Sequence, residues 1–193
     1  METLATTSTA DRASSGKQPR FSGMSHISLP CLDLEASKIF YSRVMGGELV
    51  HEIAGFVEYR IEDIIFGLSE QTEGWTAIED EYPHYAFYID GANYGAMKNL
   101  LDRYGVPNYF YRRGETALVY FRDPSGNLFE LYCDSGYENI SSLPSALRRG
   151  VPAIDFRRLN YRWNGQIPGH SSEMSRPHFS GFAHASVYCR DLE

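Results

Sequence analysis

The same order of hydrophobic segments occurs twice along this chain, and no other feature of the sequence restricts the fold as much. An alternating stretch comes first in each half, then one with helical periodicity, then three more strand-like stretches. In the first half these segments are 24–29, 34–45, 48–53, 56–61 and 64–68. In the second half they are 84–89, 94–104, 109–112, 117–121 and 128–133. We therefore predict an α+β fold in which two paired β-α-β-β-β modules form a cupped mixed sheet.

A closer repetition lies near the end of the sequence, where residues 179–193 match residues 21–35 at nine of fifteen positions. Such a match indicates a tandem duplication, so we interpret 179–193 as the start of a second, truncated repeat. One strand and a helix cap bury too little surface to fold alone, and we expect this segment to be mobile or to join a neighbouring sheet as an edge strand.

The rest of the chain divides around the two modules, which we place at about 21–70 and 82–134 within a domain at 21–135. Residues 1–20 are polar without hydrophobic periodicity and predict a disordered tail. Residues 136–178 predict a linker or C-terminal extension that contains several arginines, namely Arg148, Arg149, Arg157, Arg158 and Arg162.

Composition excludes several classes of function. The 25 acidic residues outnumber the 18 Lys and Arg, giving a net charge of −7, which argues against a nucleic-acid partner. The sequence contains neither an apolar stretch long enough to span a membrane nor a signal-peptide core, so we expect a cytoplasmic protein without membrane partners. The three cysteines, Cys31, Cys133 and Cys189, are far apart and suggest neither a disulfide framework nor a thiolate zinc site.

Three residues are candidate metal ligands. His26 and His84 each lie on the first strand of a module, and Glu130 is a charge among apolar residues. A buried carboxylate needs a partner or a metal, and two imidazoles with one carboxylate suit Fe(II) or Mn(II) while leaving positions open for substrate. From these residues alone, an alternative has equal support: the histidines are ordinary strand residues, and Glu130 is a charged residue at the edge of a sheet.

His26, His84 and Glu130, with the paired modules and the sequence DPSGNLFE at 123–130, resemble the vicinal oxygen chelate superfamily. This superfamily includes extradiol dioxygenases, glyoxalase I and the fosfomycin- and bleomycin-resistance proteins. The resemblance covers residues 21–134. It implies one Fe(II) or Mn(II) ion held by these three residues at the centre of the cupped sheet.

The segment 119–130 resembles the C-terminal half of the extradiol dioxygenase signature, in which a tyrosine ten residues before the glutamate ligand contacts the substrate. Tyr120 has this position. The resemblance therefore implies a metal-dependent oxidoreductase that cleaves rings, with Tyr120 as catalytic residue and Ser28, Tyr111 and Arg112 as substrate contacts. We expect a small aromatic or oxygen-chelating substrate and a possible homodimer. The signature also has a histidine where this chain has residues 111–113, Tyr-Arg-Arg.

Three alternatives stay open. Ser28, Tyr120 and the segment 82–87 also resemble the fosfomycin-resistance proteins, which open an epoxide, although Phe110 and Asn139 stand where those proteins have cations. A glyoxalase-like isomerase would place a carboxylate at Gly67. The third alternative is a ligand-binding module without catalysis. In each case, a turn centred on Ser125 predicts that Tyr120 and Glu130 lie opposite each other on one face of the sheet.

Overall fold

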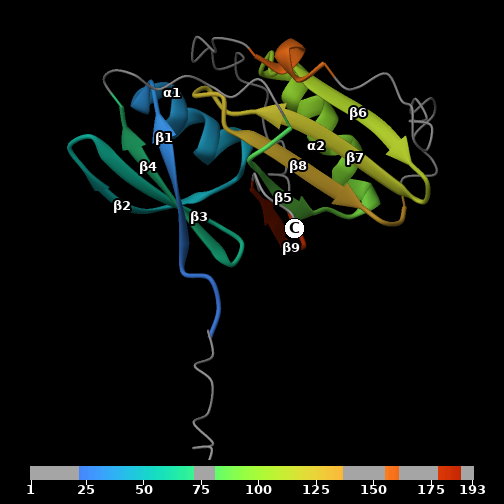
Figure 1. The fold of residues 1–193 in the computed structure, drawn as a ribbon, viewed down its shortest axis with the longest axis horizontal. Helices are drawn as coiled ribbons and strands as arrows, with labels where there is room; N and C mark the ends of the chain where they lie inside the picture. The colour runs from blue at the N-terminus through green and yellow to red at the C-terminus, as the bar shows by residue number, and fades with distance from the viewer. Residues whose placement is uncertain (1–21, 72–80, 137–154, 161–177, 188–193) are drawn as a thin grey trace, which may run out of the picture.

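The computed structural model describes residues 22–71, 81–136, 155–160 and 178–187, and the structural statements below concern these residues (Figure 1). The predicted tail at 1–20, most of the connection at 136–178 and the end of the repeat at 188–193 lie outside them. In the described part of the chain, no helix is long and apolar enough to cross a membrane.

The first module has the predicted β-α-β-β-β order. Its elements are β1 (His26–Cys31), α1 (Leu34–Ile39), η1 (Phe40–Val44), β2 (Glu48–Ile53), β3 (Phe56–Ile61) and β4 (Ile64–Glu70). The four strands form one sheet in the order β1-β4-β3-β2, with β1 parallel to β4. Asp33 caps α1 by accepting a hydrogen bond from the backbone N–H of Ala36, and the second half of the predicted helix is the π-helical turn η1.

The second module repeats this arrangement. Its elements are β5 (His84–Tyr88), α2 (Gly91–Arg103), β6 (Asn108–Arg113), β7 (Thr116–Arg122) and β8 (Leu128–Cys133). The sheet order β6-β7-β8-β5 corresponds strand for strand to β2-β3-β4-β1. The predicted fold of two β-α-β-β-β modules is therefore confirmed, with each module contributing its own sheet.

The start of α2 lies three residues earlier than the periodicity predicts. Asp90 provides the cap, because its side chain accepts a hydrogen bond of 2.8 Å from the backbone N–H of Asn93. The next residue, Gly91, lies against the backbone of Gly136, and a Cβ atom at Gly91 would approach the carbonyl carbon of Gly136 to 2.1 Å. The helix therefore begins at a cap and a close backbone contact that leaves no room for a side chain.

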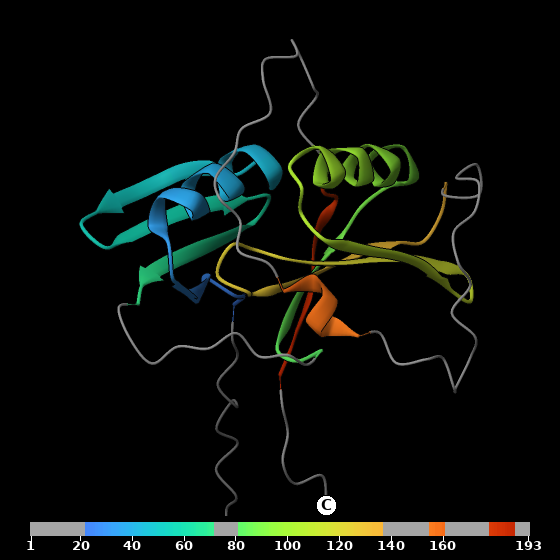
Figure 2. The same cartoon turned by 90° about the horizontal axis from the view of Figure 1, so that it is seen from above.

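Two further elements lie on the second sheet. The strand β9 (Gly181–Ser186) pairs antiparallel with β5, so the repeated segment is taken up as an edge strand. The short 3-10 helix η2 (Phe156–Leu159) packs on the sheet face opposite α2, as Figure 2 shows. The sheet therefore has a helix on one face and η2, with a cluster of aromatic side chains, on the other.

The turn between β7 and β8 joins the modules. Asp123 is buried and accepts hydrogen bonds from the Tyr41 hydroxyl at 3.0 Å and from the Asn127 amide at 2.8 Å. The same amide donates to the carbonyl of Pro30, and the Ser125 hydroxyl accepts from the backbone N–H of Leu32. Side chains of this turn therefore form hydrogen bonds with the backbone at the end of β1 and in the connection from β1 to α1.

Candidate metal centre

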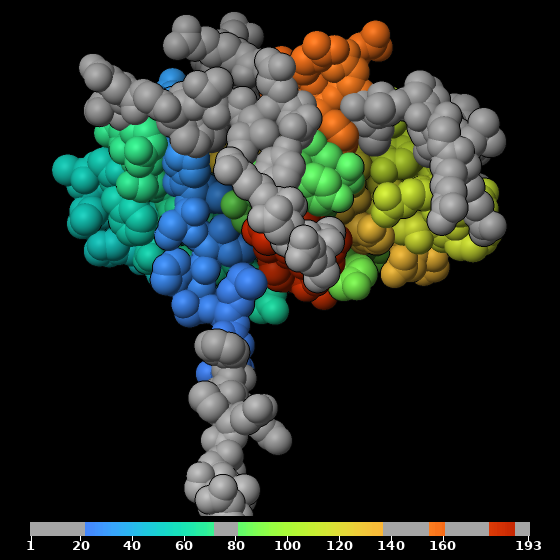
Figure 3. Space-filling model, viewed as in Figure 1, coloured from blue at the N-terminus to red at the C-terminus, as the bar shows by residue number. Residues whose placement is uncertain are grey.

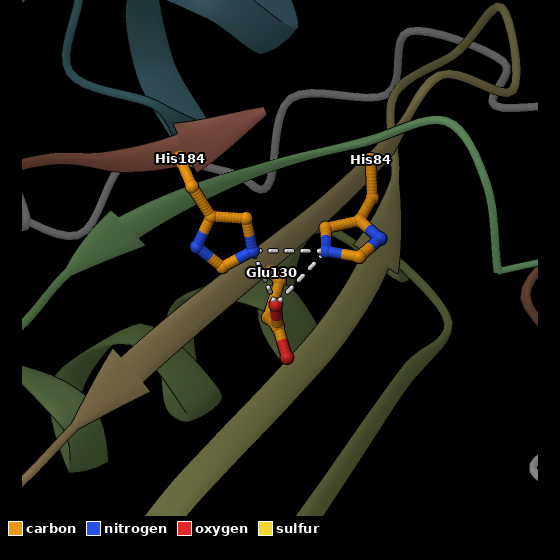
Figure 4. Close-up of side chains that lie close together, drawn as sticks. All are labelled: His84, Glu130 and His184. Carbon is orange, nitrogen blue, oxygen red and sulfur yellow. Dashed lines mark hydrogen bonds and ion pairs between the residues drawn. The ribbon is translucent and has the colours of Figure 1, made fainter. Parts of the chain in front are cut away.

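Three side chains converge on the face of the second sheet that carries η2. They are His84 from β5, Glu130 from β8 and His184 from β9, and their ligand atoms all lie within 4.8 Å of one another (Figure 4). The Nε2 atom of His84 lies 3.1 Å from Oε2 of Glu130, and the Nε2 atom of His184 lies 3.5 Å from the same oxygen. The two Nε2 atoms are 3.1 Å apart.

Strand pairing explains this convergence. Ala86 on β5 is opposite Glu130 on one side and opposite His184 on the other. Because its side chain is only a methyl group and is fully buried, Ala86 leaves space between its two larger neighbours. His84 lies two residues away, on the same face of β5.

The tautomer of His84 is determined by its second ring nitrogen. Nδ1 lies 2.9 Å from the backbone carbonyl of Glu81, which can only accept a hydrogen bond, so Nδ1 carries the proton. In the neutral ring, Nε2 then directs a lone pair toward Glu130 and His184. A histidine held in this way is typical of metal ligands.

The two imidazoles have opposite pKa shifts. Burial lowers the pKa of His84, but contacts with Glu130 and Glu81 outweigh it, and the net pKa is raised. For His184 the pKa is lowered, first by burial and further by the charges of His84 and Arg113, although Glu130 acts in the opposite direction. The environment therefore favours a neutral His184, the form that binds metal.

Glu130 is 1% exposed, and its two oxygens have different partners. Oε1 accepts a hydrogen bond of 2.5 Å from the Tyr120 hydroxyl, while Oε2 faces the imidazoles. Burial and the neighbouring Glu130 raise the pKa of Tyr120, which keeps the phenol protonated as a donor. With two imidazole nitrogens and one carboxylate oxygen directed at one point, the group fits a divalent ion with open positions for substrate.

Aromatic side chains and one arginine surround this group. The ring of Tyr111 stacks on Tyr120, and Phe156 from η2 contacts the edge of Tyr120 with ring centres 5.2 Å apart. Tyr132 packs edge to face against His184, and its hydroxyl accepts a hydrogen bond of 2.7 Å from Nη2 of Arg113. A substrate at the group would therefore meet aromatic walls and a guanidinium.

The structure brings together His84, Glu130 and Tyr120, with Tyr111 beside them, but it places His26 elsewhere. His26 lies on β1 at the edge of the first sheet, where its Nδ1 is 2.9 Å from the Ser25 hydroxyl. Ser28 is exposed on the same strand. The reason is that β1 pairs with β4, whereas β9, which repeats the sequence of β1, occupies the outer edge of β5.

Arg112 also lies away from the group. Side chains alternate along β6, so Tyr111 and Arg113 share the face of the metal group, while Phe110 packs against α2 through Tyr94. Arg112 is on the face of Phe110, and its Nε donates to the carbonyl of Gly114.

Sequence reasoning missed three residues at this site. His184 was identifiable as the repeat of His26. Arg113 was identifiable because it lies two residues after Tyr111 on the same strand, and side chains two residues apart lie on the same face of a sheet. Nothing in the sequence singles out Glu81, whose carboxylate Oε1 lies 3.2 Å from the Tyr120 hydroxyl.

Curated proteins similar to this chain include two transferases. The glutathione transferase FosA of Serratia marcescens is 27% identical over 114 residues, which are 58% of this chain and 81% of that protein. The metallothiol transferase FosB of Bacillus licheniformis is 25% identical over 122 residues, 61% of this chain and 79% of that protein.

Solved structures agree with this relationship. The fosfomycin-resistance protein FosX of Listeria monocytogenes matches with a TM-score of 0.54 and 26% identity, covering 60% of this chain and 96% of that one. A structure of an FosX mutant from the same organism, at 22% identity and a TM-score of 0.53, contains Mn(II) and 1S,2S-dihydroxypropylphosphonic acid; the match covers 64% of this chain and 100% of that one.

A family model matches residues 23–131, more than half of the chain. The matched residues include His26, His84 and Glu130, whereas His184 lies beyond them. Together with the paired modules and the convergent histidines and glutamate, this match shows that the chain belongs to the Glyoxalase/Bleomycin resistance protein/Dioxygenase superfamily.

Proposed function

We propose that this protein is a divalent-metal-dependent enzyme that opens the epoxide ring of a small phosphonate, as a transferase or hydrolase of the fosfomycin-resistance type. The observation that carries the proposal is the convergence of His84, Glu130 and His184 on one point. The named relatives are fosfomycin-resistance transferases and an FosX protein, so they favour epoxide opening over the ring-cleavage dioxygenase reaction that the signature around Tyr120 suggests.

In this proposal, His84, Glu130 and His184 hold the ion, which supplies a Lewis acid for the substrate oxygens. Mn(II) is the ion in one FosX structure, and it is the ion we propose to test first. Tyr120 orients Glu130 through their hydrogen bond, and the aromatic side chains limit the access of water.

Arg113 is our candidate for binding the anionic group of the substrate. Its guanidinium reaches the Tyr132 hydroxyl, and Tyr132 packs on His184, so the cation stands at one side of the metal group. A guanidinium binds phosphonate oxygens through two parallel hydrogen bonds. Arg113 would thus supply the positive charge that neither Phe110 nor Asn139 provides.

The reaction has a simple balance. The nucleophile, a thiol or water, forms a bond with one epoxide carbon, the carbon–oxygen bond breaks, and the ring oxygen ends as a hydroxyl with the proton that the nucleophile releases. Glu81 supplies a second carboxylate at the site, and we propose that it takes this proton from the nucleophile and passes it to the ring oxygen.

The test uses the full chain loaded with Mn(II) and fosfomycin as substrate. Phosphorus NMR follows the loss of the epoxide with glutathione, with cysteine or with water alone as nucleophile. We expect turnover with at least one of these, and loss of both bound metal and turnover in His84→Ala and Glu130→Gln. His51→Ala, which removes an exposed histidine on β2, serves as the matched control and should retain both.

Two outcomes contradict different parts of the proposal. Tight metal binding without turnover of fosfomycin by any of the three nucleophiles would reject the reaction. Metal binding by His84→Ala that equals that of the unaltered protein would reject the site itself.

A further inference from the structure

We propose that Phe156, on the short helix η2, determines which substrates fit: it closes the metal group on the side of Tyr120 and so limits the size of the substrate beside that ring. The inference rests on the proposed function and deepens it, because it names the substrate class as phosphonates with a small alkyl substituent and no aromatic one. Phe156 is then a specificity-determining residue that lies outside the two modules.

The face of the second sheet that carries the metal group also has a region of large apolar side chains. They are Tyr111, Leu118, Tyr120 and Leu128, all of them buried. Two residues of η2 complete this cluster, since Leu159 is buried in it and Phe156 packs against it. The helix therefore covers the part of the sheet face that lies next to the metal ligands.

The ring of Tyr120 connects Phe156 to the ligands. Its centre is 5.2 Å from that of Phe156 and 5.9 Å from that of His84, and both contacts are edge to face. Tyr111 stacks on the same ring, and the hydroxyl of Tyr120 donates to Glu130 at 2.5 Å. Phe156 is therefore one ring away from the ligands, and its position determines how much room a group bound beside Tyr120 has.

The metal group is enclosed unequally on its different sides. The side chains of His84 and Glu130 are 4% and 1% exposed, whereas the side chain of His184 is 39% exposed. His184 is on β9, the outer strand beyond β5, and η2 packs on β7, three strands away. A substrate can therefore approach from the side of β9, while Phe156 closes the opposite side.

The proposed contact with the anionic group indicates which end of the substrate meets Phe156. Arg113 reaches the site at Tyr132, to whose hydroxyl it donates a hydrogen bond of 2.7 Å. Tyr132 lies two residues after Glu130 on β8, and Tyr120 is opposite Glu130 on β7. A phosphonate held by Arg113 therefore directs its carbon substituent toward the rings of Tyr120 and Phe156.

The helix η2 is an addition to the part of the chain that matches the family, which ends at residue 131. Figure 3 shows η2, in orange, at the surface of the molecule. The Asp155 side chain caps the helix by accepting a hydrogen bond from the backbone N–H of Arg157, and both Arg157 and Arg158 are exposed. Its polar side thus faces solvent, while Phe156 and Leu159 face the sheet, so we expect a narrower substrate range than the shared fold alone would allow.

Binding of two inert phosphonates to the full chain loaded with Mn(II) tests this inference without turnover. Methylphosphonate carries a small substituent and phenylphosphonate an aromatic one. We expect the unaltered protein to bind phenylphosphonate about 10- to 100-fold more weakly than methylphosphonate, because the ring of Phe156 occupies the space that a phenyl group needs. In Phe156→Ala the two affinities should agree within about threefold. Titration calorimetry measures both.

Two further variants of η2 separate specificity from stability. Arg158→Ala changes an exposed side chain of the same helix and should keep the affinity ratio of the unaltered protein. Phe156→Leu keeps a smaller apolar side chain at the position and should have an intermediate ratio. A general weakening of the fold would lower the affinity for both phosphonates together and leave their ratio unchanged.

Relaxation of water protons by bound Mn(II) is a second measurement, and it requires no phosphonate. Removal of the Phe156 ring opens one side of the metal group, so the relaxation rate per bound ion should be higher in Phe156→Ala than in the unaltered protein. Arg158→Ala should have the rate of the unaltered protein.

The inference is overturned if the unaltered protein binds both phosphonates equally well, or if Phe156→Ala keeps its affinity ratio. If Phe156→Ala binds neither, an unchanged ratio in Phe156→Leu overturns it as well. Failure of the proposed function looks different, because the unaltered protein then binds neither phosphonate and does not turn over fosfomycin. Equal water relaxation in Phe156→Ala and the unaltered protein would still reject closure of the metal group by Phe156.

Discussion

Tyr120 and Glu130 lie directly opposite each other on β7 and β8, and the phenol donates a hydrogen bond of 2.5 Å to Oε1 of the carboxylate. The other carboxylate oxygen faces the two imidazoles, so one residue connects the phenol to the metal group.

Tyr120→Phe should weaken Mn(II) binding by roughly 10- to 100-fold, because the carboxylate loses the donor that orients it. At saturating Mn(II) we expect one ion per chain, with kcat lower by about 10- to 1000-fold. Titration calorimetry and the fosfomycin assay measure the two effects. Tyr88→Phe removes a hydroxyl from a partly exposed tyrosine on β5 and is the control; equal losses in both variants would contradict the assignment.

Arg113→Ala should raise KM for a phosphonate substrate by about 10- to 200-fold, as expected when a charged hydrogen bond worth about 1.5–3 kcal/mol is lost. Arg112→Ala is a closely matched control, since the two arginines are neighbours on β6 and their side chains lie on opposite faces. It should leave KM within about twofold. Steady-state kinetics with Mn(II) in excess distinguishes them, and a larger effect at Arg112 would show that the substrate lies on the other face.

Asp123 should make the stability of the fold depend on pH. Burial raises the pKa of this carboxyl to about 6, although its hydrogen bonds to Asn127 and Tyr41 act in the opposite direction. A folded-state pKa above the unfolded-state value means that the contribution of Asp123 to stability is fully present below about pH 4 and is lost as pH rises to about 6.

Relative to Asp123→Asn, which does not titrate, the free energy of unfolding of the unaltered protein should therefore fall by about 2 kcal/mol between pH 4 and pH 7. Urea unfolding with a chelator present measures this difference without a contribution from metal. Parallel pH profiles for the two proteins would rule out the titration of Asp123.

Gly91→Ala should destabilise the protein even though alanine is favoured over glycine in a helix by about 1 kcal/mol. The added Cβ atom would meet the backbone of Gly136 at 2.1 Å, so one of the two segments must move. We expect a loss of about 1–3 kcal/mol in the free energy of unfolding.

Gly105→Ala, at the end of the same helix, is the comparison. A Cβ atom added at Gly105 would have no other atom within 4 Å. The φ of +65° at this position would cost about 1–2 kcal/mol of conformational energy in a residue with a side chain. If Gly91→Ala were as stable as the unaltered protein in denaturant, the close contact with Gly136 would be wrong.

The sequence predicts the modules well because alternation and periodicity are local. The strands β2, β3 and β8 have the predicted bounds, and the pairing of Tyr120 with Glu130 follows from the length of one turn. The start of α2 was missed because the cap at Asp90 and the contact of Gly91 with Gly136 do not appear in a hydrophobic pattern.

The third histidine at the site was not predictable from local pattern. His26 and His184 have nearly the same sequence around them, and the choice depends on which strand reaches the edge of β5. That is a property of the folded chain as a whole. Arg112 and Arg113 differ for a simpler reason, since strand alternation decides between them once the orientation of Tyr111 is known.

The position of β9 also determines when the metal group can form during synthesis. His84 and Glu130 leave the ribosome with the second module, but His184 follows 100 residues after His84. A nascent chain that stops before β9 therefore has two of the three ligands in this arrangement. At about 5–20 residues per second, the third histidine arrives seconds after the second module begins to form. Within one chain, the group of three metal ligands is therefore complete only after the C-terminal strand β9 has been synthesised.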